Sequence, residues 1–261
     1  MINVVIPAAG RGQRFKDAGY ATPKPFIELD GIPMIEWVIS NVSPLENHRI
    51  ILLFLREHEF FVKLYELDKR YNIVYVDEVT EGAACTVLLA SHFIDNGDGL
   101  VIANSDQMVR WSNGKIIHSS LDYHSMKRLY WREEDSVQTM LNATHANKLD
   151  ASIAMFKDTN PKWSFAKLDA EGLVTRVAEK NPISDNATVG VYYWRFGYDF
   201  VHAVASMKRA NDRFNGEFYV CPSYNYFNGK IGSFFVDKMF GLGTPQDMES
   251  NWPLIKDYYG R

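Results

Sequence analysis

The chain has few cysteines and no excess of positive charge. Among its 261 residues only Cys85 and Cys221 carry thiols, and acidic residues outnumber basic ones to give a formal net charge of −4. Two cysteines are too few for a disulfide-stapled scaffold or a four-thiolate metal site, so we expect a reducing compartment. A negative net charge offers no basic field to a polyanion, and we expect no nucleic-acid partner.

Long apolar runs are also missing. No stretch approaches the roughly 20 apolar residues that a membrane-spanning helix needs, and the first residues resemble a core strand rather than a secretory signal. We therefore expect a cytoplasmic protein without a membrane partner. With 46% apolar residues the chain can bury a substantial core, and its length suits one large α/β domain over residues 1–261.

Apolar runs of strand length alternate with stretches of helical periodicity. This alternation is typical of a mainly parallel, twisted sheet with helices on both faces, so we predict a three-layer α/β sandwich. The predicted strands cover residues 2–7, 50–55, 73–77, 99–104, 151–156 and 188–195.

Helical periodicity predicts helices over residues 34–42 and 57–70, and a third from Gly82. A turn between two alternating stretches predicts a hairpin over residues 164–179. Residues 107–150 are long for a connection between two strands, and we interpret them as a helix with an inserted loop. The periodicity of the second helix turns four apolar side chains inward: Phe60, Phe61, Leu64 and Leu67.

The most informative stretch follows the first predicted strand. Residues 4–6 lead into a loop with Gly10 and Gly12, where backbone N–H groups can approach an anion with no Cβ in the way. Guanidinium and ammonium groups together suit a triphosphate, so this pattern predicts a phosphate-binding loop. The positive side chains around it are Arg11, Arg14, Lys16 and Lys24.

Two familiar phosphate motifs are excluded. The Walker motif needs a Lys-Ser/Thr pair directly after its last glycine, and neither Gly10 nor Gly12 is followed by one. The dinucleotide fingerprint needs a third glycine where Phe15 stands, and Pro23 and Pro25 interrupt the helix that would hold the pyrophosphate. Two glycines alone would more often form a simple tight turn, and the neighbouring cations are what favour phosphate binding.

Residues 9–15 (Ala-Gly-Arg-Gly-Gln-Arg-Phe), followed by Pro-Lys-Pro at residues 23–25, resemble the signature loop of the nucleotidyltransferases. These enzymes join a nucleoside monophosphate to a sugar phosphate or a similar phosphorylated small molecule. The resemblance implies the Rossmann-like fold of the nucleotide-diphospho-sugar transferases, also called GT-A. Further matching pieces follow in the family's order at residues 82–84, 104–106, 179–180, 189–192 and 242–247.

The resemblance also implies roles on the nucleotide side. Arg14 is expected to hold the departing pyrophosphate, and Lys24 the α-phosphate as charge builds on it. Small residues after Glu81 would let a base ring lie flat. The nucleotide-binding candidates are Ala8, Ala9, Gly10, Arg11 and Gly12 in the loop, with Glu81, Gly82 and Ala83 for the base.

Asp106 is the leading metal candidate. It follows the apolar residues 100–103, so its carboxylate is expected at the carboxyl end of the sheet, where ligands bind in open α/β folds. Mg²⁺, the expected cofactor, uses few carboxylates together with substrate phosphates; capping of the next segment is the alternative. The family's second metal Asp, in a pattern like Asp-x-Gly-Thr, is replaced here by Gly241. Asp237 is the nearest substitute, and a solvated strand-end residue is its alternative role.

On the acceptor side, Glu179 and Lys180 match a family pair that lies over the phosphorylated co-substrate, where Glu accepts from a hydroxyl and Lys contacts the phosphate. An exposed, solvated pair is the alternative. Gly190 either lets a ligand approach the backbone or marks a bulge. Glu217 and Tyr219 are candidates for the same pocket, with core packing as their alternative. The acceptor-binding set is therefore Asp106, Glu179, Lys180, Gly190, Glu217 and Tyr219.

The resemblance predicts a metal-dependent nucleotidylyltransferase. An acceptor phosphate would attack the α-phosphorus of a nucleoside triphosphate and release pyrophosphate, with Arg14, Lys24 and Lys180 as the catalytic cations. Among relatives CTP is favoured, with UTP or dTTP also open, and the acceptor is a sugar phosphate, a phospho-alcohol or an amino-acid-derived phosphate, as in surface-polysaccharide synthesis. We allow for a homo-oligomer.

Two alternatives stay open. A GT-A glycosyltransferase would more typically carry an Asp-x-Asp pair, whereas Asn104 stands at the first place here. A nucleotide sensor without catalysis would explain the missing carboxylate before Gly243.

Overall fold

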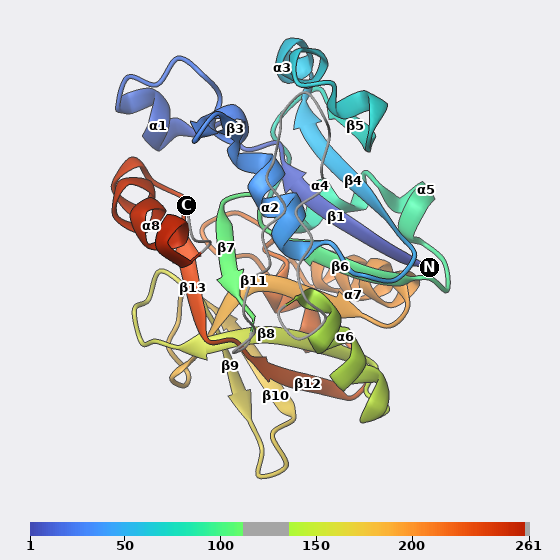
Figure 1. Ribbon diagram of the computed structural model, residues 1–261. Coiled ribbons are helices and arrows are strands. Elements are labelled where there is room, and N and C mark those ends of the chain that lie inside the picture. Colours follow the sequence, from blue (N-terminus) through green and yellow to red (C-terminus); the bar gives the residue numbers. More distant parts are fainter. Residues whose placement is uncertain (112–135, 259–261) are drawn as a thin grey trace.

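The computed structural model describes residues 1–111 and 136–258, and within them a nine-stranded mixed sheet forms the centre of the molecule (Figure 1). Four neighbouring strands, β6, β1, β4 and β5, are parallel, whereas β11 runs antiparallel to each of its neighbours. The main path is β10 (Val174–Glu179), β9 (Ser164–Leu168), β11 (Asn186–Trp194), β6 (Gly99–Ala103), β1 (Ile2–Ala8), β4 (His48–Leu55) and β5 (Asn72–Val76). β8 (Ala151–Lys157) branches from it by pairing with β11, and β12 (Ile231–Phe235) pairs with β8.

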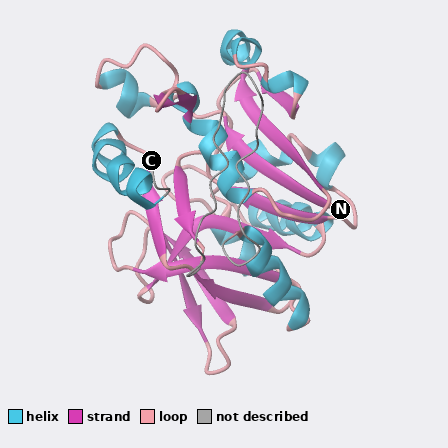
Figure 2. Ribbon diagram, in the orientation of Figure 1, coloured by secondary structure: helices cyan, strands magenta, loops and turns pink. Residues whose placement is uncertain are grey.

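Helices cover both faces of this sheet (Figure 2). Side chains alternate along the central strand β1, so each face has apolar side chains that helices can bury. Val4 and Ile6 belong to one buried cluster, whereas Val5, between them, belongs to the other. The first cluster includes residues of α2 (Met34–Val42) and α6 (Val137–Ala146). The second includes residues of α4 (Ala83–Leu88), α5 (Ser91–Ile94) and α7 (Gly197–Arg209).

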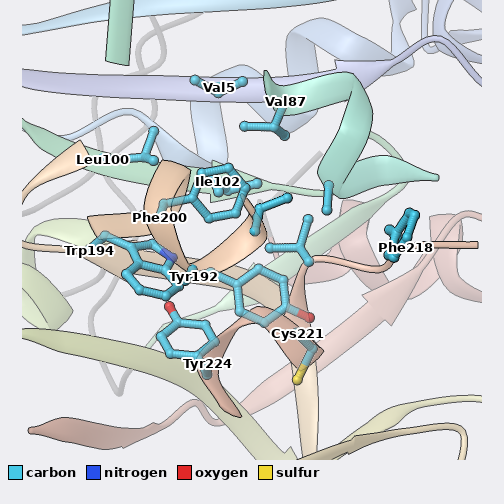
Figure 3. Close-up of a cluster of buried hydrophobic side chains, with 14 of the residues drawn as sticks. Val5, Val87, Leu100, Ile102, Tyr192, Trp194, Phe200, Phe218, Cys221 and Tyr224 are labelled. Carbon is cyan, nitrogen blue, oxygen red and sulfur yellow. The ribbon is translucent and has the colours of Figure 1, made fainter. Parts of the chain in front are cut away.

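The second cluster is rich in aromatic side chains (Figure 3). Trp194 of β11 stacks on Tyr224 with the ring centroids 4.3 Å apart, and the Tyr224 hydroxyl donates to the carbonyl oxygen of Ser152 on β8. These contacts fasten the 3-10 helix η5 (Cys221–Tyr226) to the sheet. Phe218, in the segment just before η5, is buried in the same cluster, beside residues of α4.

The predicted α/β fold class is confirmed. All six predicted strands are present as β1, β4, β5, β6, β8 and β11, each within two residues of its expected bounds. The hairpin over residues 164–179 forms as β9 and β10, and the helix over residues 34–42 is α2. The sheet is more mixed than predicted, because β11 inserts antiparallel beside β6. Within the described residues, no helix has the length and apolar character that a membrane crossing requires.

The single helix predicted over residues 57–70 is wrong. The chain there forms η2 (Arg56–His58), α3 (Glu59–Leu64) and η3 (Leu67–Lys69), separated at Glu66, which has a positive φ of 52°. The inward face is also different from the predicted one, since Phe60 and Leu64 of α3 are exposed while Val62 and Leu67 are buried. A break of this kind ends the 3.6-residue periodicity on which the prediction depended.

The interpretation of residues 107–150 is confirmed for its helix, which is α6. The stretch begins as strand β7 (Gln107–Arg110), which pairs antiparallel with β13 (Lys238–Gly241). The inserted loop, at residues 112–135, lies outside the described residues.

A third buried cluster joins the two ends of the described chain. It holds Phe15 of α1 (Gln13–Asp17) and Met248 and Ile255 of α8 (Pro245–Tyr258). Near it, α8 contacts the small hairpin of β2 (Glu28–Leu29) and β3 (Ile32–Pro33), since Lys256 pairs with Asp30 at 3.1 Å. The loop after β1 is therefore held from one side by the C-terminal helix.

Asn41 of α2 should contribute strongly to stability. Its buried amide donates to the carbonyl oxygen of Val109 and accepts from the Val109 N–H, each at 2.8 Å, and so occupies the free edge of β7. Asn41→Ala leaves both backbone groups without these partners, and we expect a loss of about 2–4 kcal/mol in the free energy of unfolding by urea. Asn228→Ala, in an exposed loop, should change it by less than about 0.5 kcal/mol. Equal losses in the two variants would contradict this role.

Candidate active site

The carboxyl ends of β1 and β6 lie at one edge of the sheet. The two strands are parallel, with Val5 opposite Ile102, so the loop that follows Ala8 and the turn that follows Ala103 start side by side. Residues 9–12 leave the first strand, and residues 104–106 leave the second. The predicted phosphate loop and the predicted metal carboxylate are thus brought to the same place.

Gly12 joins the loop to Lys24. Its φ of 62° lies in the left-handed region, and a Cβ built on it would lie 3.3 Å from the Lys24 Cβ. The Lys24 side chain, at the start of η1 (Lys24–Phe26), therefore lies close to the backbone of Gly12. A larger residue here would push that side chain away.

Lys24 and Asp106 form an ion pair at the centre of this edge. The Lys24 Nζ donates to Asp106 Oδ2 at 2.8 Å, and the two side chains are 18% and 27% exposed. The closing Gly-Thr also reaches this point, because a Cβ on Gly243 would lie 3.0 Å from the same oxygen. Three segments distant in sequence thus meet around one carboxylate.

The remaining cations around the loop differ in whether they form ion pairs with other side chains. Lys16 lies 4.0 Å from Glu57. Arg11 and Arg14 are exposed, and neither forms an ion pair within 4.0 Å with any residue that the structure describes. Their guanidinium groups are therefore available to an anion over the loop.

Asp237 does not join Asp106. It forms an ion pair with Arg110 at 3.4 Å, at the opposite end of the β7–β13 ladder from Gly241. The four residues of β7 lie between the two carboxylates along this ladder, which makes five steps, or about 17 Å at the usual rise. The prediction that Asp237 supplies a second ligand to the ion on Asp106 is wrong, because strand register rather than sequence proximity to the Gly-Thr decides which residue faces the site.

The donor set restricts how a metal could be held. In the described part of the chain, no three His, Cys, Asp or Glu side chains come together as a metal site, and Asp106 is already paired with a lysine. One carboxylate fits a Mg²⁺ ion that arrives with substrate phosphates, which supply its other oxygens. It does not fit an ion held by the protein alone.

Four of the six acceptor candidates, Glu179, Lys180, Glu217 and Tyr219, lie at or near the exit of β10. Glu179 is only 8% exposed and accepts a hydrogen bond from Ser164 Oγ. Burial raises the pKa of its carboxyl, against the opposing effects of Ser164 and Lys180. Lys180 Nζ donates to the Tyr219 hydroxyl at 2.9 Å and lies 4.7 Å from the centre of that ring. Glu217 joins Glu179 in lining a cavity of about 210 Å³.

Gly190 marks a bulge, the second of its predicted alternatives. The pairing of β11 with β8 shifts register between Thr188 and Tyr192, and Gly190 has a φ of 73°. A Cβ there would lie 2.3 Å from Asn104 Nδ2 and 2.5 Å from Gln107 Nε2. Side-chain amides from the turn after β6 thus fill the space beside this glycine.

Gln107 was not among the predicted site residues. It is 6% exposed, and its Nε2 has no hydrogen-bond partner among the described residues. A buried, unsatisfied amide next to Asp106 is a donor that a ligand oxygen could satisfy. Only its place after the Asn-Ser-Asp turn could have suggested it from the sequence.

The predicted base-binding segment lies at the start of α4. Ala84, which follows it, belongs to the same buried cluster as Ala9 of the phosphate loop, so the segment and the loop are held by one core. Arg213 donates to Glu81 Oε1 at 2.7 Å, and this hydrogen bond lowers the pKa of the Glu81 carboxyl. Gly82 has a φ of 124°, and its Cβ position lies 2.5 Å from the Phe218 carbonyl oxygen. Its small size is therefore needed for close backbone contact.

A glycine loop at the carboxyl edge of parallel strands, beside a Lys–Asp pair, is the arrangement that the resemblance to nucleotidyltransferases implied. Residues 4–111 match the family model described as the MobA-like NTP transferase domain. The match covers less than half of the chain, and the resemblance to nucleotidyltransferases is confirmed.

Curated relatives agree with this assignment. The chain is 24% identical over 230 residues to the bifunctional protein GlmU of Thermotoga sp. strain RQ2, covering 86% of this chain and 44% of that protein. It is 36% identical over 81 residues to the 2-aminoethylphosphonate cytidylyltransferase of Lancefieldella rimae, covering 30% of this chain and 31% of the relative. The chain thus spans less than half the length of either relative.

Solved structures share the fold over the whole chain. The nucleoside-diphosphate-sugar pyrophosphorylase of Vibrio cholerae RC9 superposes with a TM-score of 0.73 at 21% identity, covering 100% of both chains. The fold is therefore the one that the resemblance implied.

Replacing Glu179 should reveal its buried charge. The raised pKa means that the native state binds this proton more readily than the unfolded chain does, so wild-type stability falls as the pH rises above the ordinary carboxyl value of 4.5. Glu179→Gln keeps an acceptor for Ser164 and does not titrate. We expect this variant to be more stable than wild type in urea at pH 7.5, with the difference vanishing near pH 4.

The control for this comparison is Glu171→Gln in the exposed turn of the hairpin, which should show no such pH-dependent gain. A Glu179→Gln variant that is less stable than wild type at pH 7.5 would contradict the account of Glu179.

Asp106→Asn should tighten metal-free polyphosphate binding. The substitution removes a negative charge from the site and releases the Lys24 ammonium from its ion pair. In EDTA at low salt, we expect the Kd of inorganic tripolyphosphate, measured by calorimetry, to fall about three- to tenfold. Weaker binding than wild type would show that the pair does not restrain Lys24.

Proposed function

We propose that this chain is a nucleotidylyltransferase. It transfers a nucleoside monophosphate from a nucleoside triphosphate to a phosphorylated small molecule and releases pyrophosphate. The observation that carries the proposal is the convergence of the Gly10–Gly12 loop, Lys24 and Asp106 at the carboxyl edge of the sheet. Such an edge is where open α/β folds bind their ligands.

The proposed mechanism depends on charge and alignment. The acceptor phosphate is already ionised at neutral pH and needs no strong base. Arg14 binds the departing pyrophosphate, and Lys24 neutralises charge that builds on the α-phosphate. A Mg²⁺ ion bound with the nucleotide at Asp106 would neutralise phosphate charge. Lys180, oriented by its hydrogen bond to Tyr219, fixes the incoming phosphate.

The acceptor is proposed to occupy the cavity lined by Glu179 and Glu217. Its volume of about 210 Å³ suits a small phosphorylated molecule rather than a polymer. A sugar phosphate and a phospho-alcohol or amino-acid-derived phosphate both fit this description.

CTP is the proposed nucleotide. This proposal is supported by the similarity to a 2-aminoethylphosphonate cytidylyltransferase. Because the chain also resembles GlmU and a nucleoside-diphosphate-sugar pyrophosphorylase, the binding test below includes other nucleotides. A role in making activated precursors for surface polysaccharide, in the cytoplasm, is part of the same proposal.

A thermal-shift screen tests nucleotide binding. The chain is heated with CTP, UTP, dTTP or ATP, each with Mg²⁺, and a ligand that binds only the folded state raises its Tm. We expect CTP to give the largest shift. Shifts from none of the four would contradict the proposal.

Pyrophosphate release then separates a transferase from its rivals. CTP is incubated with glucose 1-phosphate, 2-aminoethyl phosphate and 2-aminoethylphosphonate, and pyrophosphate is measured. A glycosyltransferase would release none, and a nucleotide sensor would bind CTP without turnover.

Lys24→Ala should lower kcat by about 10²–10³-fold, as expected when a charge that stabilises the transition state is lost. The fold should persist, because Lys24 is partly exposed and its loss leaves Asp106 accessible to water. The charge-matched control is Lys69→Ala. Lys69 is an exposed lysine at the end of η3 that pairs with Glu66, and this variant should keep the wild-type rate. Wild-type turnover in Lys24→Ala would contradict the role of Lys24.

A further inference from the structure

The segment that binds the base and the segment that lines the acceptor pocket are joined by backbone hydrogen bonds. The Phe218 N–H donates to the Glu81 carbonyl oxygen at 2.7 Å, and the Ala84 N–H donates to the Phe218 carbonyl oxygen at 3.0 Å. Both backbone groups of one residue are therefore used to hold the start of α4. Of the predicted nucleotide residues 81–83, Glu81 is one anchoring point, and Gly82 and Ala83 lie between it and Ala84.

This junction is too close for a side chain. At Gly82 a Cβ would lie between 2.5 and 2.9 Å from the N, O and C atoms of Phe218. Phe218 is 1% exposed and belongs to the same buried cluster as Val87 of α4; both are labelled in Figure 3. The base segment thus rests directly on the backbone of Phe218, and any shift of Phe218 would move it.

The neighbours of Phe218 serve the acceptor. Glu217 lines the acceptor cavity, and the Tyr219 hydroxyl accepts from Lys180, the proposed anchor of the incoming phosphate. Phe218 itself points into the core. Three consecutive residues therefore connect the two proposed substrate sites.

Arg213 holds the junction from outside. Its guanidinium lies 4.2 Å from the centre of the Phe218 ring and donates to Glu81 Oε1 at 2.7 Å. Its Nε donates to Asn211 Oδ1 at 2.6 Å, which fixes the plane of the guanidinium. Arg213 also lines the acceptor cavity. One side chain thus contacts both segments.

We propose that Arg213 is a positioning residue that holds the base segment and the acceptor segment as one unit, so that its loss weakens the binding of both substrates. The proposal rests on the proposed function. A planar guanidinium can stack on a ring and donate to a carboxylate at once, which a lysine ammonium does less well. Loss of Arg213 leaves the chemistry of Lys24 and Asp106 intact but loosens the two binding surfaces.

The test compares Arg213→Ala, Arg213→Lys and wild type. Calorimetry with CTP and Mg²⁺ should show Kd raised about three- to tenfold in Arg213→Ala and partly restored in Arg213→Lys. With whichever acceptor of the panel supports pyrophosphate release, KM for CTP and for the acceptor should both rise by similar factors, while kcat stays within about twofold. Hydrogen exchange should become faster at the amides of Phe218 and Ala84.

The matched control is Arg209→Ala, an exposed arginine of α7 that bonds to Ser206 and should change none of these values. An unchanged Kd for CTP in Arg213→Ala, or a rise in the acceptor KM alone, would overturn the inference while leaving the proposed function in place. If the wild type binds no nucleotide, the proposed function fails and the inference fails with it.

Discussion

The ion pair between Lys24 and Asp106 is the interaction on which the rest of the site depends. In the free protein the two charges neutralise each other at 2.8 Å. In the proposed function, a polyphosphate with the cation that accompanies it would offer both of them a new partner, since phosphate oxygens attract the ammonium and the cation attracts the carboxylate. The pair therefore keeps two strongly charged groups positioned without leaving either uncompensated at a partly buried edge.

Strand pairing and two glycines bring the segments of the site to this ion pair. Parallel pairing of β1 and β6 places the two loops together, and Gly12 and Gly243 let Lys24 and the closing Gly-Thr approach Asp106. On the other side of the site, the core that holds α4 also holds the segment with Phe218. The proposed nucleotide and acceptor segments thus share one buried core, which suits a reaction that depends on alignment.

Much of the fold followed from local pattern, because strands and short turns are encoded by neighbouring residues. The prediction of one helix over residues 57–70 is wrong because Glu66 adopts a left-handed conformation, which the periodicity of apolar residues does not reveal. In the site, Lys24 and Asp106 were each predicted, but their contact spans 82 positions and depends on strand pairing. Asp237 was misplaced because register cannot be deduced from spacing alone. Arg213 and Phe218 carry no motif, and their importance arises only from contacts made in the folded chain.

A crystal structure of the chain with CTP and Mg²⁺ tests the central claim most directly. The account predicts that the triphosphate lies over residues 10–12, that Lys24 contacts a phosphate oxygen, and that its 2.8 Å contact with Asp106 is broken. A triphosphate bound elsewhere on the molecule, with the Lys24–Asp106 pair intact and the loop facing solvent, would contradict it.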